Sequence, residues 1–448
     1  MACHLLRSPG KDLHVTLIEK RPDVGRGIAY YTANPDHLLN VRAANMSAFS
    51  DQPDHFWQWL RARQNGGQAA WGPCDDPFCF APRQVYGEYI ASLIAPLLSN
   101  AERSNGLRIV RGECTSLDPD PRGVTATLAD GSCHRGDLVV LATGYETLTS
   151  PSDCFADPWV PPEDAKIEKD ARILILGTGL TMVDYVLALI LAGHKGPIFA
   201  LSRRGLLPHA HHSVQPLPIN EADIPLGTSL TDLTRWLRKT AAEHTAQGGD
   251  WRSIVDGIRP FTQQIWQRLG MSARRQFLEH ARAWWDVHRH RMAPQVRARI
   301  DAAISSGLLT VVAAKLCRIE TAEQRATLVH YRRRGANVVE TMEVDKIVDC
   351  RGIGITPFKV VNPVLCNLLE RGLARLDPLS IGLDVTAECA LVDRRGVASE
   401  RLFAVGPLTR AAFWEIIAVP DIRNQCAVLA NRLLRAADGS VSLRLALR

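Results

Sequence analysis

One segment constrains the fold of this chain more than any other: two apolar runs joined by a glycine turn at 171–193. It reads ARILILGTGLTMVDYVLALILAG. The unbroken apolar stretch "ILIL" is typical of a strand buried in a parallel sheet, and the second run has the length of a helix. Glycines at such a corner permit a tight turn and let the first backbone N–H groups of the helix approach a pyrophosphate. The segment therefore predicts a dinucleotide-binding βαβ unit, although Met182 stands in place of the third glycine. The contacts are assigned to Gly177, Thr178, Gly179, Leu180 and Thr181.

The next predicted strand, PIFALSRRG, carries a signal for the type of nucleotide. It ends in Ser202, Arg203 and Arg204 and has no acidic residue there. An acid at this position favours the free ribose 2′-hydroxyl of NADH, whereas guanidinium groups favour a 2′-phosphate. The pattern predicts a preference for NADPH. The alternative is that these arginines are simply solvated.

The N-terminal region contains another predicted strand, His14–Glu19, which reads HVTLIE and, unlike PIFALSRRG, ends in an acid. In a nucleotide-binding unit such an acid binds a ribose, and a glycine-rich loop lies about 20 residues before it. That position falls upstream of Met1. Glu19 is assigned to the ribose, with a surface acid as the alternative.

The remaining segments predict an α/β fold with two related Rossmann-like dinucleotide-binding domains. A β-meander is expected in "RIVRGECTSL", "GVTATLADG" and "RGDLVVLATG", and a similar pattern recurs before "IVDCRG". A helical insertion at about 229–294 begins with a capping box of Ser229 and Asp232. The predicted domains are 1–160 (first part of one dinucleotide-binding domain), 161–355 (the other dinucleotide-binding domain) and 356–448 (second part of the first domain).

Bulk composition excludes several classes of function. The net charge is only +6 and no dense basic block is present, which argues against nucleic-acid binding. No apolar stretch has the length of a membrane span, and no signal peptide is recognisable. Eleven scattered cysteines fit a reducing cytoplasm better than a disulfide framework, and a redox role for Cys74 and Cys79 in "CDDPFC" is the minor alternative. The "HAHH" and "HRH" clusters lack completing ligands, so no metal site is predicted.

Several motifs together resemble the FAD/NAD(P)-binding proteins related to class B flavin monooxygenases and N-hydroxylases. The motifs are "GRGIAYYTANPDHLLNVRAANMSAF" (Gly25–Phe49), "PRQVYGEYI" (Pro82–Ile90), "ATGY" (Ala142–Tyr145), "GTGLTMVD" (Gly177–Asp184), "SRRGLLPHAH" (Ser202–His211), "WWDVHRHRMAP" (Trp284–Pro294) and "GPLTRAAFWEIIAVPDIRNQ" (Gly406–Gln425). The resemblance implies FAD and NADPH as cofactors. It also implies domains of the glutathione-reductase type, with 1–160 and 356–448 as the two parts of the FAD-binding domain and 161–355 as the NAD(P)H-binding domain.

The resemblance also implies which residues of the first domain approach FAD, in addition to Glu19. They are Arg26, Gly27, Asn40, Met46, Arg83, Tyr86, Thr143, Gly144, Gly406, Pro407 and Pro420. Relatives begin with a strand and a glycine loop that would precede this chain, as expected from a misplaced or alternative start. We therefore expect an empty sheet position with exposed apolar flanks, and weak FAD binding.

The function implied is an FAD-dependent, NADPH-using oxidoreductase, with hydroxylation of a small molecule by molecular oxygen, at an amine nitrogen among other candidate atoms. Two alternatives stay open: an NAD(P)H:acceptor reductase without oxygenation, and a non-catalytic nucleotide-binding protein that has lost the first phosphate loop. No catalytic side chain, substrate or oligomeric state follows from the sequence.

Overall fold

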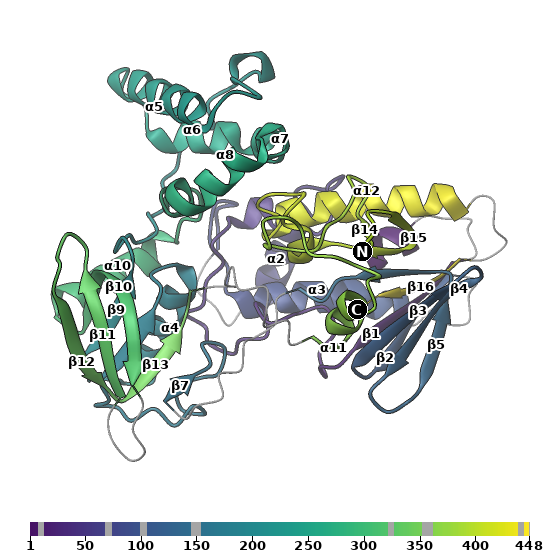
Figure 1. The fold of residues 1–448 in the computed structure, drawn as a ribbon, viewed down its shortest axis with the longest axis horizontal. Coiled ribbons are helices and arrows are strands. Elements are labelled where there is room, and N and C mark those ends of the chain that lie inside the picture. The colour runs from purple at the N-terminus through teal and green to yellow at the C-terminus, as the bar shows by residue number, and fades with distance from the viewer. Residues whose placement is uncertain are drawn as a thin grey trace. The chain divides into compact units, whose positions relative to one another are not determined.

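The computed structural model describes residues 1–7, 13–67, 74–98, 105–144, 154–320, 327–351, 362–437 and 443–447 (Figure 1). The chain forms two compact units. Unit 1 comprises Met1–Ala33, Val41–Glu146 and Ile355–Arg448, and unit 2 comprises Asn34–Asn40 and Thr147–Gly354. The α/β fold class is confirmed, since each unit is built on a largely parallel sheet with helices.

Unit 1 contains a six-stranded sheet in the order β14-β15-β6-β16-β1-β2. All neighbouring strands run parallel except β14, which pairs antiparallel with β15. The strands are β1 (Leu13–Glu19), β2 (Asn105–Arg111), β6 (Leu138–Leu141), β14 (Ala390–Val392), β15 (Ala398–Ala404) and β16 (Leu443–Leu447). The helices are α1 (Ala2–Leu6), η1 (Ala43–Asn45), α2 (His55–Asn65), α3 (Arg83–Leu98), α11 (Pro363–Glu370), η5 (Gly406–Thr409) and α12 (Val419–Ala437).

The C-terminal strand β16 overturns the prediction of an empty position in this sheet. It lies between β1 and β6, and Leu445 is in register with Val15 on one side and Leu138 on the other. After β15, helix α12 carries the chain back so that a further parallel strand can join, as in a βαβ unit. The backbone groups of β1 and β6 that would otherwise lack a partner are thereby paired. The alternating segment "SLRLAL" was the sequence signal for this strand.

Interrupting β16 tests this arrangement. Replacing Leu445 with proline removes a backbone N–H from the centre of the sheet, and we expect the free energy of unfolding to fall by about 3 kcal/mol or more. Leu445→Val keeps the backbone donor and should stay close to the parent in chemical denaturation. Equal stability of the two variants would contradict the position of β16.

A small antiparallel sheet follows β2 and confirms the first predicted meander in part. The predicted third segment, "RGDLVVLATG", contributes only its first two residues to this sheet, and its apolar part is β6 of the six-stranded sheet. Its strands are β3 (Cys114–Asp120), β4 (Gly123–Leu128) and β5 (Cys133–Gly136). The prediction of one continuous strand through "RIVRGECTSL" was wrong. The chain turns at Gly112, whose N–H donates to the carbonyl of Glu19, so that β2 stays with β1 while β3 joins β4.

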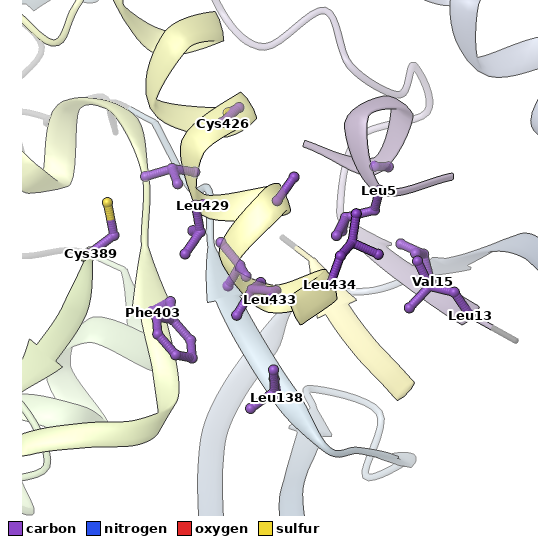
Figure 2. Packing of buried hydrophobic residues seen from close by; sticks show 14 of the residues in the cluster. Leu5, Leu13, Val15, Leu138, Cys389, Phe403, Cys426, Leu429, Leu433 and Leu434 are labelled. Carbon is purple, nitrogen blue, oxygen red and sulfur yellow. The ribbon is translucent and has the colours of Figure 1, made fainter. Parts of the chain in front are cut away.

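One apolar core of unit 1 lies where α12 packs against the sheet (Figure 2). Leu429, Leu433 and Leu434 of α12 are each no more than 5% exposed and meet Leu5, Val15 and Phe403. Large apolar side chains buried to this degree stabilise a fold by about 1.5–3 kcal/mol each. The helix that precedes β16 is therefore firmly anchored.

Unit 2 contains a seven-stranded sheet in the order β12-β11-β10-β9-β8-β13-β7. Its strands are β7 (Phe155–Ala156), β8 (Ile173–Leu176), β9 (Ile198–Ser202), β10 (Leu309–Glu320), β11 (Thr327–Arg333), β12 (Val339–Val344) and β13 (Lys346–Asp349). The five strands from β7 to β10 in this order are parallel, and β10, β11 and β12 form the predicted second meander.

Helices of unit 2 include the predicted insertion. They are α4 (Leu180–Leu191), η2 (Glu221–Asp223), α5 (Leu230–Ala246), α6 (Trp251–Ile258), η3 (Arg259–Phe261), α7 (Thr262–Arg268), α8 (Met271–Gln276), η4 (Phe277–Ala281), α9 (Arg282–Arg289) and α10 (Pro294–Ser305). Ser229 caps α5 as predicted, because its hydroxyl accepts from the N–H of Asp232. Within the described part of the chain, no helix combines the length and apolarity that a bilayer crossing requires.

Candidate functional site

The glycine turn after β8 lies at the carboxyl edge of the parallel sheet in unit 2. Gly177 has φ +106°, and a Cβ there would lie 2.7 Å from the carbonyl oxygen of Cys350. Only glycine fits this corner without displacing β13. Gly179 precedes α4 in extended conformation, with nothing within 4 Å of an added Cβ. The turn therefore brings open backbone to the start of α4.

Side-chain hydrogen bonds hold this turn in place. Thr178 is buried, and its hydroxyl donates to the carbonyl of Leu206 at 2.6 Å and lies within hydrogen-bond distance of Ser202 Oγ, at 2.9 Å. Ser202 Oγ also accepts from the N–H of Gly205. Thr178 and Ser202 thus support the loop from inside. The first turn of α4, with Leu180 and Thr181, has no side-chain cap, and its backbone N–H groups suit an anion.

The structure separates the roles of the two predicted arginines. Arg204 donates from Nη2 to the carbonyl of His280 at 2.7 Å and lies 5.7 Å from the ring centre of Trp284. It therefore joins β9 to the helical insertion. Arg203 is exposed and has no ion-pair partner among the described residues. Arg203 is the better candidate for a 2′-phosphate.

Replacing Arg203 with alanine should weaken NADPH use selectively. We expect the KM for NADPH to rise about 10–50-fold and that for NADH to change little, since one charge-assisted phosphate contact is lost. Steady-state rates at varied NADPH and NADH concentrations measure the two KM values. Equal effects on both nucleotides would remove Arg203 from phosphate recognition.

The carboxyl edge of the sheet in unit 1 gathers three predicted groups, because β1, β6 and β15 are parallel. Glu19 ends β1, Thr143 and Gly144 follow β6, and Gly406 and Pro407 follow β15. Thr143 Oγ1 is buried without a hydrogen-bond partner, and Gly144 has φ +67° with open space at an added Cβ. An orphaned hydroxyl beside open backbone fits a polar ligand. Tyr145, the last residue of "ATGY", lies outside the described residues.

Gln425 of α12 organises the turn after β15, and sequence reasoning assigned it no role. Its Oε1 accepts from the N–H of Gly406 at 2.7 Å, and its Nε2 donates to Thr409 Oγ1 at 2.9 Å. Thr409 Oγ1 in turn donates to the carbonyl of Gly406 at 2.8 Å. Gly406 has φ +72°, and Pro420 is buried in the first turn of α12. Gln425 therefore fixes Gly406 and Pro407 relative to the start of α12.

Two predicted residues of unit 1 lie inside its core. Met46 is 2% exposed at the end of η1, and Tyr86 is 1% exposed in a ring cluster with Tyr30 and Phe56. Burial raises the pKa of Tyr86 well above its ordinary value, so this phenol stays neutral. Both side chains have packing roles that the sequence could not separate from cofactor contact.

The other predicted residues lie at scattered places. Arg26 lies between two glycines of positive φ, and its Nη1 is 3.9 Å from Oδ2 of Asp23. Gly27 has nothing within 4 Å of an added Cβ. Arg83 begins α3. Asn40 belongs to unit 2, where its carbonyl meets the ring of His211 at 3.0 Å.

The histidine clusters and cysteines are organised differently. His209 and His288 pack with Trp251 at ring distances of 4.7–5.2 Å, and burial lowers the pKa of His209. No group of three or more metal-ligating side chains occurs in the part of the chain that the structure describes. Cys74 and Cys79 form a disulfide, which the interpretation of eleven unpaired cysteines did not favour.

The residues at the two edges offer different groups to a dinucleotide. Unit 2 offers the glycine turn, the uncapped helix start and Arg203, which suit a pyrophosphate and a 2′-phosphate. Unit 1 offers Glu19, Thr143, Gly144 and the Gly406 turn, which suit the ribose and ring system of FAD. No strand–glycine loop–helix corner like that of unit 2 occurs within the described residues of unit 1, and β16 occupies the central strand position.

This combination of sheets, meanders and edges defines a flavoprotein fold with two dinucleotide-binding domains. A family model described as FAD-NAD(P)-binding matches residues 1–146, about a third of the chain. No curated protein sequence matches the chain significantly.

Solved structures identify the variant of this fold. An ornithine N-hydroxylase from Kutzneria sp. 744, solved with reduced FAD, NADP⁺ and L-ornithine, matches at TM-score 0.60 and 11% identity over 96% of this chain and 100% of its own. A cadaverine monooxygenase from Erwinia amylovora bound to FAD matches at TM-score 0.60 and 12% identity over 96% and 95%. L-lysine 6-monooxygenase from Pseudomonas syringae matches at TM-score 0.56 and 14% identity over 96% and 100%. The chain has the fold of these N-hydroxylating flavin monooxygenases, as the resemblance predicted.

Proposed function

We propose that this protein is an FAD-dependent, NADPH-using oxidoreductase that hydroxylates a small molecule, with an amine nitrogen as the favoured position. The main support for the proposal is the carboxyl edge of the parallel sheet in each unit, because the two edges offer groups that suit different nucleotides. The FAD-NAD(P)-binding match to residues 1–146 and the fold of N-hydroxylases support it.

The chain's own residues divide the work of binding. The Gly177 turn and the start of α4 hold the pyrophosphate of NADPH, and Arg203 holds its 2′-phosphate. Glu19 binds the FAD ribose, Thr143 donates its unused hydroxyl to the cofactor, and the Gly406 turn approaches the flavin. When bound, FAD would supply the hydride-accepting and oxygen chemistry that these residues do not supply themselves.

The start of α12 gives the protein a means of tuning the flavin. The positive end of a helix stabilises nearby negative charge, and Gln425 fixes this helix against the Gly406 turn. We infer that this arrangement favours the anionic reduced form of the cofactor. The chain thus orients and tunes the cofactor and needs no nucleophilic side chain of its own.

The assay that tests the proposal is NADPH oxidation in air with added FAD. Ornithine, lysine and cadaverine serve as first amine substrates, because the structural relatives carry those names. We expect an amine to accelerate NADPH oxidation and to yield a hydroxylated amine. NADPH oxidation without a hydroxylated product from any amine would contradict the assignment to N-hydroxylation.

Two alternatives have distinct outcomes in the same assay. Peroxide release equal to NADPH consumption, without product, favours a reductase that does not oxygenate. Binding of NADPH without bound FAD and without NADPH oxidation favours a non-catalytic nucleotide-binding protein. The orphaned hydroxyl of Thr143 and the exposed Arg203 support nucleotide binding at the two edges, because Thr143 offers a buried hydroxyl without a partner and Arg203 an accessible guanidinium.

A further inference from the structure

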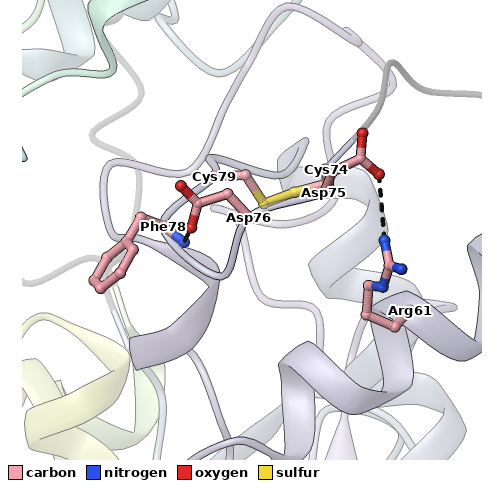
Figure 3. The surroundings of a disulfide bond; sticks show 6 residues. All are labelled: Arg61, Cys74, Asp75, Asp76, Phe78 and Cys79. Carbon is pink, nitrogen blue, oxygen red and sulfur yellow. Dashed lines mark hydrogen bonds and ion pairs between the residues drawn. A yellow bond between two sulfur atoms is a disulfide. The ribbon is translucent and has the colours of Figure 1, made fainter.

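A loop closed by a disulfide lies against the short helix η1 in unit 1 (Figure 3). Cys74 and Cys79 are joined with their Cα atoms 5.5 Å apart, an ordinary separation for a disulfide. The other nine cysteines of the chain are free thiols. The proposed redox chemistry of the cofactors does not use this disulfide.

Two backbone hydrogen bonds connect the loop to η1. The N–H of Ala43 donates to the carbonyl of Cys79 at 2.9 Å, and the N–H of Ala44 donates to the carbonyl of Pro77 at 2.8 Å. Both acceptors lie at the Cys79 end of the loop, which the disulfide joins to Cys74. The position of η1 therefore depends on the conformation of 77–79.

Helix α12 contacts the end of η1 and the segment that follows it. Nη1 of Arg423 lies 3.4 Å from the carbonyl oxygen of Asn45 and 2.9 Å from that of Ser47. Arg423 is on the same helix as Gln425, which fixes the Gly406 turn. Contacts thus run without interruption from the disulfide loop through η1 to the helix at the proposed flavin edge.

The two cysteine residues differ in exposure. Cys74 is 3% exposed, whereas Cys79 is only partly buried and Asp75, Asp76 and Phe78 around the bond are exposed. In the amide orientation that satisfies both groups, the side chain of Gln64 pairs with the backbone of Cys74 at 2.9 and 3.2 Å, and Arg61 pairs with Asp75 at 3.2 Å. The Cys74 end is thus fixed by other contacts, and Cys79 is the more exposed cysteine of the pair.

We propose that Cys74 and Cys79 form a thiol–disulfide exchange site that controls the position of η1. A thiolate of a dithiol reductant attacks Cys79 Sγ, the bond to Cys74 Sγ breaks, and Cys74 leaves as a thiolate that takes up a proton. The second thiol of the reductant then attacks its own sulfur in the mixed disulfide and releases Cys79. The reductant ends as a cyclic disulfide and the protein gains two thiols, so electrons and protons balance.

Opening this disulfide should act locally. It closes a very short loop, and the chain entropy that a disulfide removes grows with loop length. Reduction therefore frees 77–79 from η1 without unfolding unit 1. If the proposed function holds, the reduced form should bind FAD about fivefold more weakly, at the low end of couplings between two sites.

The experiment compares full-length protein before and after treatment with dithiothreitol under native conditions. Alkylation with peptide mass analysis reports whether both cysteines become thiols, and hydrogen exchange of the peptide containing Ala43 and Ala44 reports release of η1. FAD titration is the third readout. The variant C74S/C79S fixes the open form, and C133S/C317S, which replaces two exposed free cysteines, is the matched control.

We expect dithiothreitol to expose both thiols, exchange at Ala43 and Ala44 to accelerate about tenfold, and C74S/C79S to behave like the reduced parent. The control should respond to dithiothreitol as the parent does. Unreactive cysteines, or exchange that is the same in both forms, would overturn the proposal. Faster exchange in a protein that binds no FAD in either form would support the exchange site and reject the proposed function.

Discussion

Replacing Gly177 with alanine is expected to abolish NADPH-dependent turnover, with a loss of at least about 100-fold in kcat/KM. The backbone φ of +106° is strained for any residue with a Cβ, and the added methyl would lie 2.7 Å from the carbonyl oxygen of Cys350. The turn must move away from β13, and the first N–H groups of α4 move with it. Stopped-flow reduction of the cofactor by NADPH and steady-state kinetics measure the loss.

The control for this variant is Gly270→Ala. Gly270 caps α8 with an ordinary φ of −66°, and an added Cβ meets nothing within 4 Å. This variant should match the parent in both turnover and thermal unfolding. If Gly177→Ala keeps NADPH-dependent turnover, the turn after β8 is not the NADPH site.

Replacing Gln425 with leucine should lower the free energy of unfolding by about 2–4 kcal/mol and weaken FAD binding by at least about tenfold. Leucine has nearly the same volume but leaves the buried N–H of Gly406 without an acceptor and Thr409 without its donor. The Gly406 turn is then free to move relative to α12. Chemical denaturation measures the free energy of unfolding, and FAD titration measures the affinity for FAD.

Asn431→Leu is the matched control, because Asn431 is exposed on the same helix. Its effect on stability should stay within about 0.5 kcal/mol, as for most surface substitutions. Normal FAD affinity in Gln425→Leu, together with lowered stability, would limit Gln425 to a structural role. Unchanged stability would contradict the buried hydrogen-bond network.

The features that the sequence predicted well are those with a local signal. The apolar strand before Gly177, the Ser229 cap and the two meanders each depend on residues close in the chain. The turn at Gly177 accepts only glycine, because its φ is positive and it approaches Cys350 closely. A glycine after an apolar strand was therefore a usable signal in the sequence.

The features that the sequence did not predict depend on contacts between distant segments. Strand β16 lies beside β1, more than 400 residues away, and no local pattern reports that pairing. Thr178 has its hydroxyl bonded inside the loop, and Tyr86 packs in a ring cluster, so residue type alone did not reveal their surroundings. The role of Gln425 became visible only when η5 and α12 were placed together.

The most direct test of the two-nucleotide account is anaerobic reduction of added FAD by NADPH in the presence of the protein. We expect saturable FAD binding, and loss of the visible flavin band on addition of NADPH that is faster than with NADH. In Gly177→Ala, flavin reduction should be slow and NADPH should have no advantage over NADH. A protein that fails to bind FAD at saturating concentration, or whose bound FAD stays oxidised with NADPH, would contradict it.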